Sequence, residues 1–159
     1  MTNDSFVYAV KRNHKRLFMI ALSYTKSHED AEDILQNVFL KLWRHSNEFQ
    51  DDEHIDKWLT RVCINECKNY IKMPFLRNTT LDEAMELYTF DKPRDFDVFN
   101  ALMSLPRKEH TVIVLFYYED MSTKEIAELL KTKEPTIKTR LRRARIKLKD
   151  ILGEDWINE

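Results

Sequence analysis

The chain of 159 residues has few of the residues that tight turns need, with one Gly and four Pro. β-Hairpins and the phosphate-binding loops of α/β folds depend on Gly-rich turns, so this composition argues against an all-β fold and against a nucleotide-binding loop. Long stretches rich in Leu, Ile, Glu, Lys and Arg favour helices instead. We therefore predict an all-α protein.

Long hydrophobic runs are also missing. The longest uninterrupted apolar run covers residues 112–118, well short of the roughly 20 residues that cross a bilayer. The first residues, MTNDSFVYAVKRNHKRLF, lack the continuous apolar centre of a signal peptide. We expect a soluble cytoplasmic protein with no membrane contact of its own.

Cysteine is scarce, with Cys63 and Cys67 four residues apart. That spacing on one helix suggests no disulfide framework, and it matches no zinc-binding pattern even with His54 nearby. Cysteine is often a small buried hydrophobic residue, which is the interpretation we favour. We predict neither a metal nor a cofactor.

The formal net charge of −1 hides an uneven distribution of charge. Residues 1–72 hold eleven basic and eleven acidic side chains, whereas residues 73–100 hold three basic and six acidic ones. Residues 131–149 hold nine basic side chains and one acidic side chain, a net charge of +8. A concentration of this kind indicates a polyanionic partner.

Helical periodicity divides the chain into two parts. It runs through residues 5–73 and returns through residues 98–152, whereas residues 74–97 contain two Pro, an acidic excess and little periodicity beyond one helical turn at residues 81–87. We predict two small helical domains, residues 1–73 and 98–159, joined by a flexible linker, residues 74–97.

The second domain contains a helix-turn-helix pattern. Ser122 and Glu125 have the spacing of a capping box before a short helix that ends near Leu130. Pro135 suits the first turn of a second helix, where a missing N–H costs little. A short helix, a tight turn and a second helix form the pattern of many DNA-binding proteins.

The second helix has a core stripe between two basic flanks, with Thr139 facing outward. Because acidic partners at i±4 are nearly absent, we favour DNA contact over a solvated amphipathic helix. A helix-turn-helix alone leaves a repressor, an activator or a promoter-recognition subunit open. The stripe is Ile137, Leu141, Ala144 and Leu148; the flanks are Lys138, Arg142, Arg145 and Lys149 on one side and Arg140, Arg143 and Lys147 on the other.

Two helix faces of the first domain suggest contacts with other molecules. On the helix that begins after Ser27, Leu40 lies among polar residues opposite the core face, which indicates a docking surface or an ordinary exposed leucine. On the helix that follows, a basic stripe runs past Asn65 beside Trp58; the alternative is a solvated face with a core Trp. Cations fit phosphates, an amide can bind a base edge, and an aromatic ring can stack on an unpaired base.

Three stretches make the chain similar to a known family. DAEDILQNVFLKLWR, WLTRVCINECKNYI and LPRKEHTVIVLFYYEDMSTKEIAELLKTKEPTIKTRLRRARIKL, in this order, closely resemble bacterial RNA polymerase sigma factors of the extracytoplasmic-function (ECF) class. The resemblance covers about residues 17–152. It implies a subunit that docks on core polymerase, recognises the minus-35 and minus-10 promoter elements and promotes DNA melting.

The resemblance also implies roles for individual residues. Those expected to dock on the clamp helices of the polymerase β′ subunit are Asp33, Gln36, Asn37 and Leu40. Those expected to contact the minus-10 element are Lys57, Trp58, Arg61, Asn65 and Lys68. Those expected to contact the minus-35 element are Lys138, Thr139, Arg140, Arg142 and Arg143.

The implied partners are core RNA polymerase, including its β flap, promoter DNA and an anti-sigma factor of the kind usual for this class. The alternative is a free-standing helix-turn-helix regulator, which leaves the first domain's two faces unexplained. An enzyme finds little support, because the sequence has no convincing nucleophile–base set, and we predict no catalytic residue.

The sequence departs from the family pattern at four places. Lys131 stands in the helix-turn-helix turn where Gly is usual, and Pro135 replaces another common Gly. After Lys72 only Arg77 remains of the basic run that often follows the minus-10 helix. The stretch FQDDEHI, predicted to be a loop that approaches DNA, carries three acids.

Overall fold

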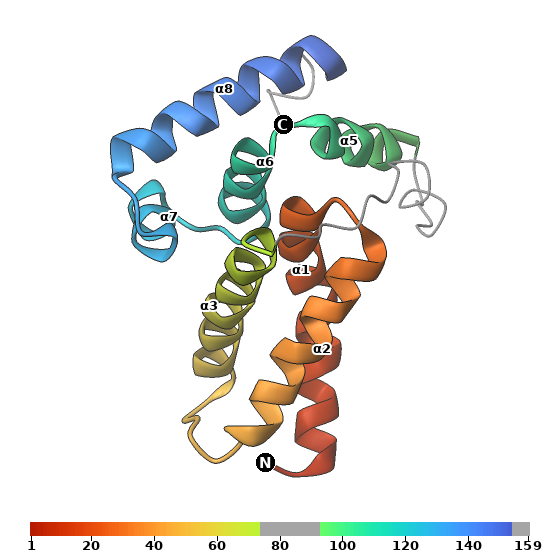
Figure 1. The fold of residues 1–159 in the computed structure, drawn as a ribbon, viewed down its shortest axis with the longest axis vertical. Helices are drawn as coiled ribbons and strands as arrows, with labels where there is room; N and C mark the ends of the chain where they lie inside the picture. Colours follow the sequence, from red (N-terminus) through yellow and green to blue (C-terminus); the bar gives the residue numbers. More distant parts are fainter. Residues whose placement is uncertain (74–92, 154–159) are drawn as a thin grey trace. The chain divides into compact units, whose positions relative to one another are not determined.

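The computed structural model describes residues 1–73 and 93–153, and side chains in the second stretch from residue 97. These residues form helices and no strand, which confirms the all-α prediction for the described part of the chain. They belong to two compact units, one on each side of residues 74–92 (Figure 1). The helical turn predicted at residues 81–87 lies outside the described residues.

The first unit is a three-helix bundle of α1 (Asn3–Thr25), α2 (His28–Arg44) and α3 (Asp52–Ile71), in which each helix contacts the other two. Ser27 Oγ caps α2 by accepting a hydrogen bond from the backbone N–H of Asp30 at 3.2 Å, as the sequence predicts. The largest fully buried side chains of this core are Leu17, Ile20, Leu22, Leu35, Leu42, Leu59 and Ile64.

Both cysteines are free and buried within this bundle. The Cys63 thiol lies 3.7 Å from the backbone oxygen of Leu17. Burial raises the pKa of the Cys67 thiol well above its usual value, because a buried thiolate loses its hydration. The pair therefore packs in the core as small hydrophobic residues.

The second unit is built around its last helix, which contacts three of the helices before it. α5 begins at Pro93, so the helical part of this unit starts five residues earlier than Val98, where the sequence periodicity returns. The elements are α5 (Pro93–Ser104), α6 (Arg107–Ile113), the π-helical turn η1 (Val114–Tyr118), α7 (Thr123–Leu130) and α8 (Glu134–Leu152).

The helix-turn-helix prediction is confirmed by α7 and α8. Ser122 Oγ accepts from the backbone N–H of Glu125 at 3.1 Å and the Glu125 carboxylate accepts from that of Ser122 at 3.2 Å, which completes the capping box. Pro135 lies in the first turn of α8. No helix among residues 1–73 and 93–153 is long and apolar enough to cross a membrane.

Candidate nucleic-acid interface

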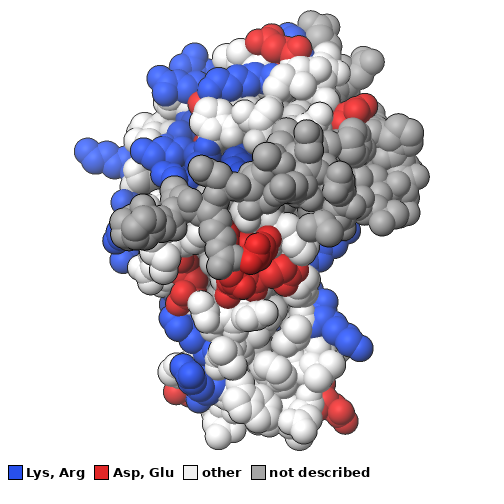
Figure 2. All heavy atoms as spheres, turned by 45° about the vertical axis from the view of Figure 1, so that its right-hand side comes forward, with Lys and Arg blue, Asp and Glu red and all other residues white. Residues whose placement is uncertain are grey.

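The predicted core stripe of α8 is confirmed. Ile137, Leu141, Ala144 and Leu148 are at most 2 % exposed, since α8 packs this stripe against α5, α6 and α7. The basic side chains of α8 are thereby held at its flanks and outer face. Figure 2 shows Lys and Arg gathered over the part of the molecule where α8 runs.

Several basic residues of α8 are engaged within the second unit. Lys138 Nζ lies 3.6 Å from the Glu134 carboxylate. Arg145 donates to the Tyr117 hydroxyl at 2.9 Å, and its guanidinium lies 5.4 Å from the centre of the Phe116 ring. These contacts orient the helix and reduce the charge available to a ligand.

Lys147 is also engaged, because its ammonium donates to both carboxylate oxygens of Glu109 at 2.8 and 3.0 Å. Arg140, Arg142 and Arg143, by contrast, have no ion pair with any residue that the structure describes. Arg142 and Arg143 are exposed and Arg140 is half-buried. The cationic face of α8 therefore centres on these three arginines.

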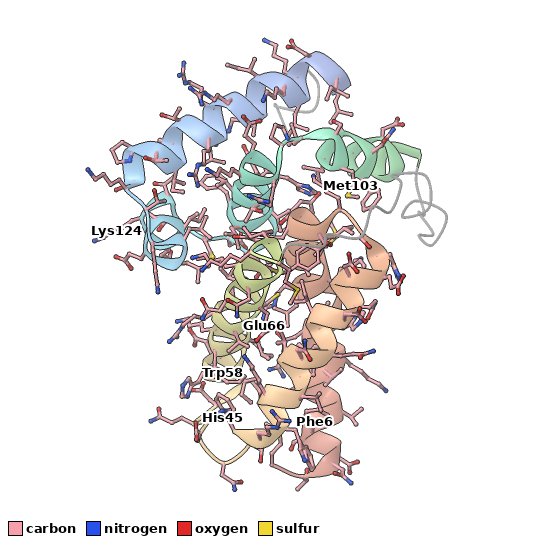
Figure 3. The ribbon with its side chains drawn as sticks, in the orientation of Figure 1. Phe6, His45, Trp58, Glu66, Met103 and Lys124 are labelled. Carbon is pink, nitrogen blue, oxygen red and sulfur yellow. The ribbon has the colours of Figure 1, made fainter. Side chains whose placement is uncertain are left out.

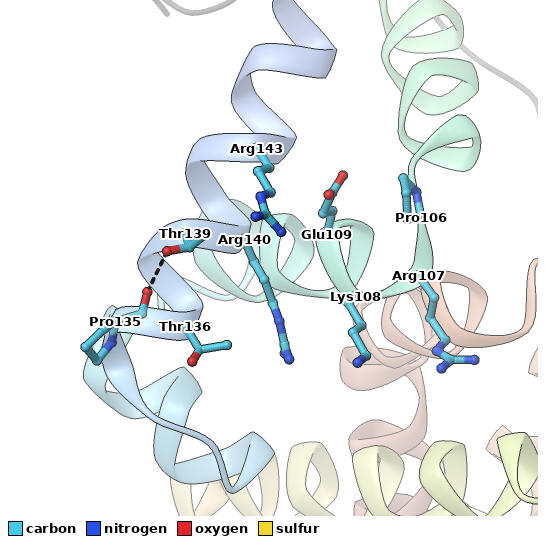
Figure 4. Close-up of a pocket in the computed structure, with 9 residues that line it drawn as sticks. All are labelled: Pro106, Arg107, Lys108, Glu109, Pro135, Thr136, Thr139, Arg140 and Arg143. Atoms are coloured by element: carbon cyan, nitrogen blue, oxygen red, sulfur yellow. Dashed lines mark hydrogen bonds between the residues drawn. The ribbon is translucent and has the colours of Figure 1, made fainter.

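Thr139 is half-buried, which corrects the expectation that it faces directly outward. Its hydroxyl donates to the backbone oxygen of Pro135 at 3.0 Å, so the side chain folds back along the helix. It lines a cleft of about 700 Å³ between α8 and the start of α6 (Figure 4). The hydroxyl oxygen can still accept a hydrogen bond from a ligand.

The cleft brings in two residues that the sequence reasoning did not select, Arg107 and Lys108. They come directly after Pro106 at the start of α6, whereas Arg140 and Arg143 come from α8 (Figure 4). The adjacent basic pair in the sequence is the only signal that could have pointed to them. The sequence does not show that this pair lies near α8, because that proximity arises from the packing of α6 against α8.

The turn between α7 and α8 resolves the question raised by the missing Gly. Lys131 adopts the left-handed conformation, with φ 57° and ψ 49°. The turn thus keeps its geometry at an expected cost of about 1 kcal/mol for the Cβ atom. Thr123 Oγ1 donates to the Glu134 carboxylate at 2.8 Å, and this hydrogen bond joins the starts of α7 and α8. The same bond lowers the pKa of Glu134, and the positive charge of Lys138 lowers it further by a smaller amount.

In the first unit, the four predicted docking residues are all exposed along one face of α2. Leu40 is 53 % exposed and Trp43, which the sequence reasoning did not select, is 46 % exposed. Trp43 follows Gln36 by seven residues and so continues the same face. Its ring meets Phe6 of α1 edge-on at 5.1 Å.

A groove of about 620 Å³ runs beside this face. Gln36, Leu40 and Trp43 line it from α2, and Phe6 and Val10 line it from α1. The exposed leucine is therefore part of a continuous apolar surface and not an isolated side chain. Such surfaces commonly mark contacts with other proteins.

The predicted minus-10 residues lie along α3. Arg61 and Asn65 are exposed and Lys68 is half-buried. Lys57 is exposed and pairs with Glu53 at 3.0 Å. Trp58 is half-buried, so the structure leaves part of its ring accessible.

Trp58 belongs to an aromatic cluster at the end of the bundle where α2 leads into α3 (Figure 3). Its ring centre lies 5.1 Å from that of Phe49, which meets it edge-on, and 5.7 Å from that of His45. Phe49 also meets His54 edge-on at 5.3 Å. These neighbouring rings hold the indole in place, as an aromatic platform for a base requires.

Two acids of α3, Asp56 and Glu66, are directed away from the basic stripe, whereas Glu53 pairs with Lys57 within it. Asp56 accepts from Arg12 at 2.6 Å and from the Asn13 amide at 3.0 Å, both on α1. Glu66, in the C-terminal half of α3, pairs with Lys41 of α2. Asp56 and Glu66 thus hold the bundle together and leave Arg61 of the stripe without an ion pair among the described residues.

The acids of FQDDEHI stabilise the start of α3. The prediction that this stretch is a loop is wrong from Asp52 onward, because α3 begins there. Asp51 caps the helix by accepting from the backbone N–H of His54 at 2.8 Å. Asp52 lies 3.5 Å from Arg12, and Asp52 and Glu53 occupy the first turn, where the helix dipole favours negative charge.

Comparison with known proteins agrees with this two-part arrangement. Residues 9–73 match the family "Sigma-70 region 2" and residues 96–148 match "Sigma-70, region 4". The RNA polymerase sigma factor SigV of Bacillus subtilis is 30 % identical over 147 residues, covering 90 % of this chain and 89 % of SigV. The ECF RNA polymerase sigma factor SigM of Mycobacterium tuberculosis is 28 % identical over 94 % of this chain and 78 % of SigM. The chain belongs to the ECF sigma factors.

Solved structures place this sigma factor in the same fold. CnrH, in complex with the cytosolic domain of CnrY, superposes with a TM-score of 0.62 at 26 % identity over 95 % of this chain and 89 % of CnrH. RpoE of Bartonella quintana, in complex with the anti-sigma factor NepR, gives a TM-score of 0.67 at 21 % identity over 95 % of this chain and 98 % of RpoE. Membership of the family confirms a role in transcription initiation and sets aside the free-standing regulator.

Proposed function

We propose that this sigma factor is the promoter-recognition and melting subunit of an RNA polymerase holoenzyme and has no catalytic activity of its own. Residues 1–73 dock on the polymerase and contact the minus-10 element, and the second domain, residues 98–159 extended by the start of α5, contacts the minus-35 element. The observation that carries the proposal is a pair of cationic surfaces, one on each unit. These are the α3 stripe through Arg61 and Asn65, and the arginines of α8.

On α8, Arg142 and Arg143 are exposed beside the core stripe and are available to base edges and phosphates of the major groove. Lys138, Thr139 and Arg140 complete the minus-35 set. Lys138 reaches DNA from its pair with Glu134, which water and salt weaken at an exposed site. Base contacts from this helix select the promoter, and phosphate contacts fix its position.

On α3, Asn65 is the residue that can bind a base edge, and Trp58 offers part of its ring for stacking. Lys57, Arg61 and Lys68 supply phosphate contacts along the same helix. Unstacking a base costs a few kcal/mol, so melting requires interactions that favour the open strand over the duplex. When both DNA-binding units are held on one polymerase, binding of one unit raises the effective concentration of the other at the promoter. The two units together can therefore supply the free energy that melting requires.

The face of α2 with Asp33, Gln36, Asn37 and Leu40 docks on the β′ clamp helices, and the apolar groove beside it extends the contact to Trp43. The second domain contacts the β flap. RpoE and CnrH are solved with an anti-sigma factor and with the cytosolic domain of CnrY, and we extend an anti-sigma partner to this chain. The protein acts in the cytoplasm, where the polymerase is.

Run-off transcription tests the proposal. Purified bacterial core polymerase is assayed with and without this protein on fragmented genomic DNA from its source. New discrete transcripts whose start sites share two upstream elements are the expected result, and they also define the promoter. Specific DNA binding by the protein alone, with no new transcript, would contradict the proposal.

A further inference from the structure

The cleft between α6 and α8 collects four cationic side chains from separate parts of the second unit. Arg107 and Lys108 come from the start of α6, and Arg140 and Arg143 come from α8 (Figure 4). None of the four has an ion pair with a residue in the described ranges. Like charges brought this close repel unless an anion lies between them.

The carboxylate in the cleft does not supply that anion. Glu109 is only 8 % exposed, and both of its oxygens accept hydrogen bonds from Lys147. Glu109 and Lys147 thus join α6 to α8, and their two charges neutralise each other. The cleft of about 700 Å³ therefore presents four uncompensated positive charges to a ligand.

The position of the cleft relative to α8 indicates which ligand it fits. At 100° per residue, Arg140 and Arg143 fall on one flank of the core stripe, and Lys138 and Arg142 fall on the other. A helix in the major groove has a row of phosphates on each side. The flank with Arg140 and Arg143 thus faces one strand, and the cleft places Arg107 and Lys108 beside that flank.

We infer that this cleft binds backbone phosphates of one DNA strand at the minus-35 element, and that Arg107 and Lys108 position the DNA there. The inference rests on the proposed function of α8 and adds residues outside the helix-turn-helix. Phosphate contacts fix register and orientation but carry no sequence information. Arg107 and Lys108 therefore contribute affinity and salt dependence, whereas Arg142 contributes sequence preference.

Salt titration of the R107Q/K108Q variant tests this division. The full chain is assembled with core polymerase and bound at low temperature to the promoter fragment mapped by run-off transcription, and to the same fragment with its minus-35 element replaced. Losing two phosphate contacts lowers the salt slope by about two, so between 50 and 200 mM salt the wild type loses about tenfold more affinity than the variant. The ratio of affinities for the two fragments stays unchanged.

A matched control is K11Q/K15Q, which removes the same charge from exposed positions on α1 and should leave the slope unchanged. A second measurement replaces single phosphates near the minus-35 element with uncharged methylphosphonates. Wild type should lose affinity at adjacent positions of one strand, and R107Q/K108Q should be insensitive there. Equal sensitivity of both proteins, an altered fragment ratio or weaker binding to core polymerase would each overturn the inference.

The R142Q variant separates failure of this inference from failure of the proposed function. If R142Q loses the preference for the minus-35 fragment while R107Q/K108Q keeps the wild-type salt slope, only the cleft assignment is wrong. If R142Q and R143Q both keep the preference, the assignment of α8 to the minus-35 element is wrong, and the cleft inference is overturned with it.

Discussion

The two units of this sigma factor treat their charges differently. In the first unit, Asp56 and Glu66 neutralise Arg12 and Lys41 of neighbouring helices, so the acids serve the bundle and the exposed stripe of α3 is what remains. In the second unit acids are too few for the cations of α8, and three arginines stay without an ionic partner among the described residues. A DNA-binding surface can thus arise by directing acids elsewhere or by omitting them.

Charge reversal on α8 should produce the largest effect, because Arg142 and Arg143 have no ionic partner among the described residues. We expect R142E/R143E to lower minus-35-dependent transcription at least about thirtyfold, since two lost DNA contacts at about 1–3 kcal/mol each sum to about 2 kcal/mol or more. Run-off transcription measures this loss. Binding to core polymerase should stay intact, and its loss would contradict the assigned role.

Leu40→Asp tests the uncharged surface of the first unit. A charged side chain in the apolar groove beside Trp43 should weaken binding to core polymerase about thirtyfold, as loss of an interface hot spot does. Affinity is measured with labelled protein and purified core polymerase. Val7→Asp is the control, because Val7 is also exposed on the first unit, at 46 %, but does not line the groove; an equal loss in both variants would point to a non-specific effect.

Asn65→Ala tests whether the α3 stripe acts on melted DNA. Loss of one base-edge hydrogen bond costs about 1–1.5 kcal/mol, so open-complex formation should fall about tenfold. Permanganate reactivity of unpaired thymines measures opening, and binding at low temperature measures the closed complex. The exposed Asn100 on α5 offers the same substitution as a control. Equal loss of opening and of closed-complex binding would mean that Asn65 has a structural role.

Lys131→Gly should stabilise the second unit alone, because Gly adopts the left-handed conformation without the Cβ penalty of about 1 kcal/mol. Amide hydrogen exchange in α7 and α8 should slow about fivefold, and exchange in α1 to α3 should not change. Lys133→Gly, at the non-helical residue before α8 with φ −88°, is the control. Faster exchange in the Lys131 variant would show that the lysine side chain stabilises the turn.

Glu134→Gln should have the smallest effect, visible only as a change in pH dependence. The Thr123 hydroxyl and Lys138 lower the pKa of Glu134 in the folded state. Its contribution to stability is therefore present above the unfolded pKa of about 4.3 and is lost as pH falls through the lower folded pKa. Thermal unfolding at pH 7 and pH 3 should differ slightly less in the variant than in wild type. An unchanged difference would mean that the Thr123 bond does not contribute.

Local patterns predict those parts of the fold that depend on residues close in sequence. The spacing of Ile137 and Leu141 suffices to identify the buried stripe of α8, since one helix face is set by its own periodicity. The capping box of Ser122 and Glu125 is also a local signal. The start of α5 at Pro93 has a local signal too, a Pro at the first helical position, but the apolar periodicity of the residues that follow it is too weak to predict a helix there.

The remainder depends on packing between distant residues. Asp56 and Arg12 are separated by 44 residues, so nothing in the local sequence shows that this acid is neutralised. The same holds for Arg107, which reaches the cleft only because α6 packs against α8. Such long-range contacts therefore decide which charges stay available, and sequence spacing reports only which charges exist.

The scarcity of Gly has a thermal consequence. Among the described residues, three that have side chains, Lys26, Asp120 and Lys131, adopt positive φ values, each at an expected cost of about 1 kcal/mol relative to Gly. For domains of this size, each such cost lowers the melting temperature by about 4–8 °C. The protein therefore melts at a lower temperature than it would with glycine at these three turns.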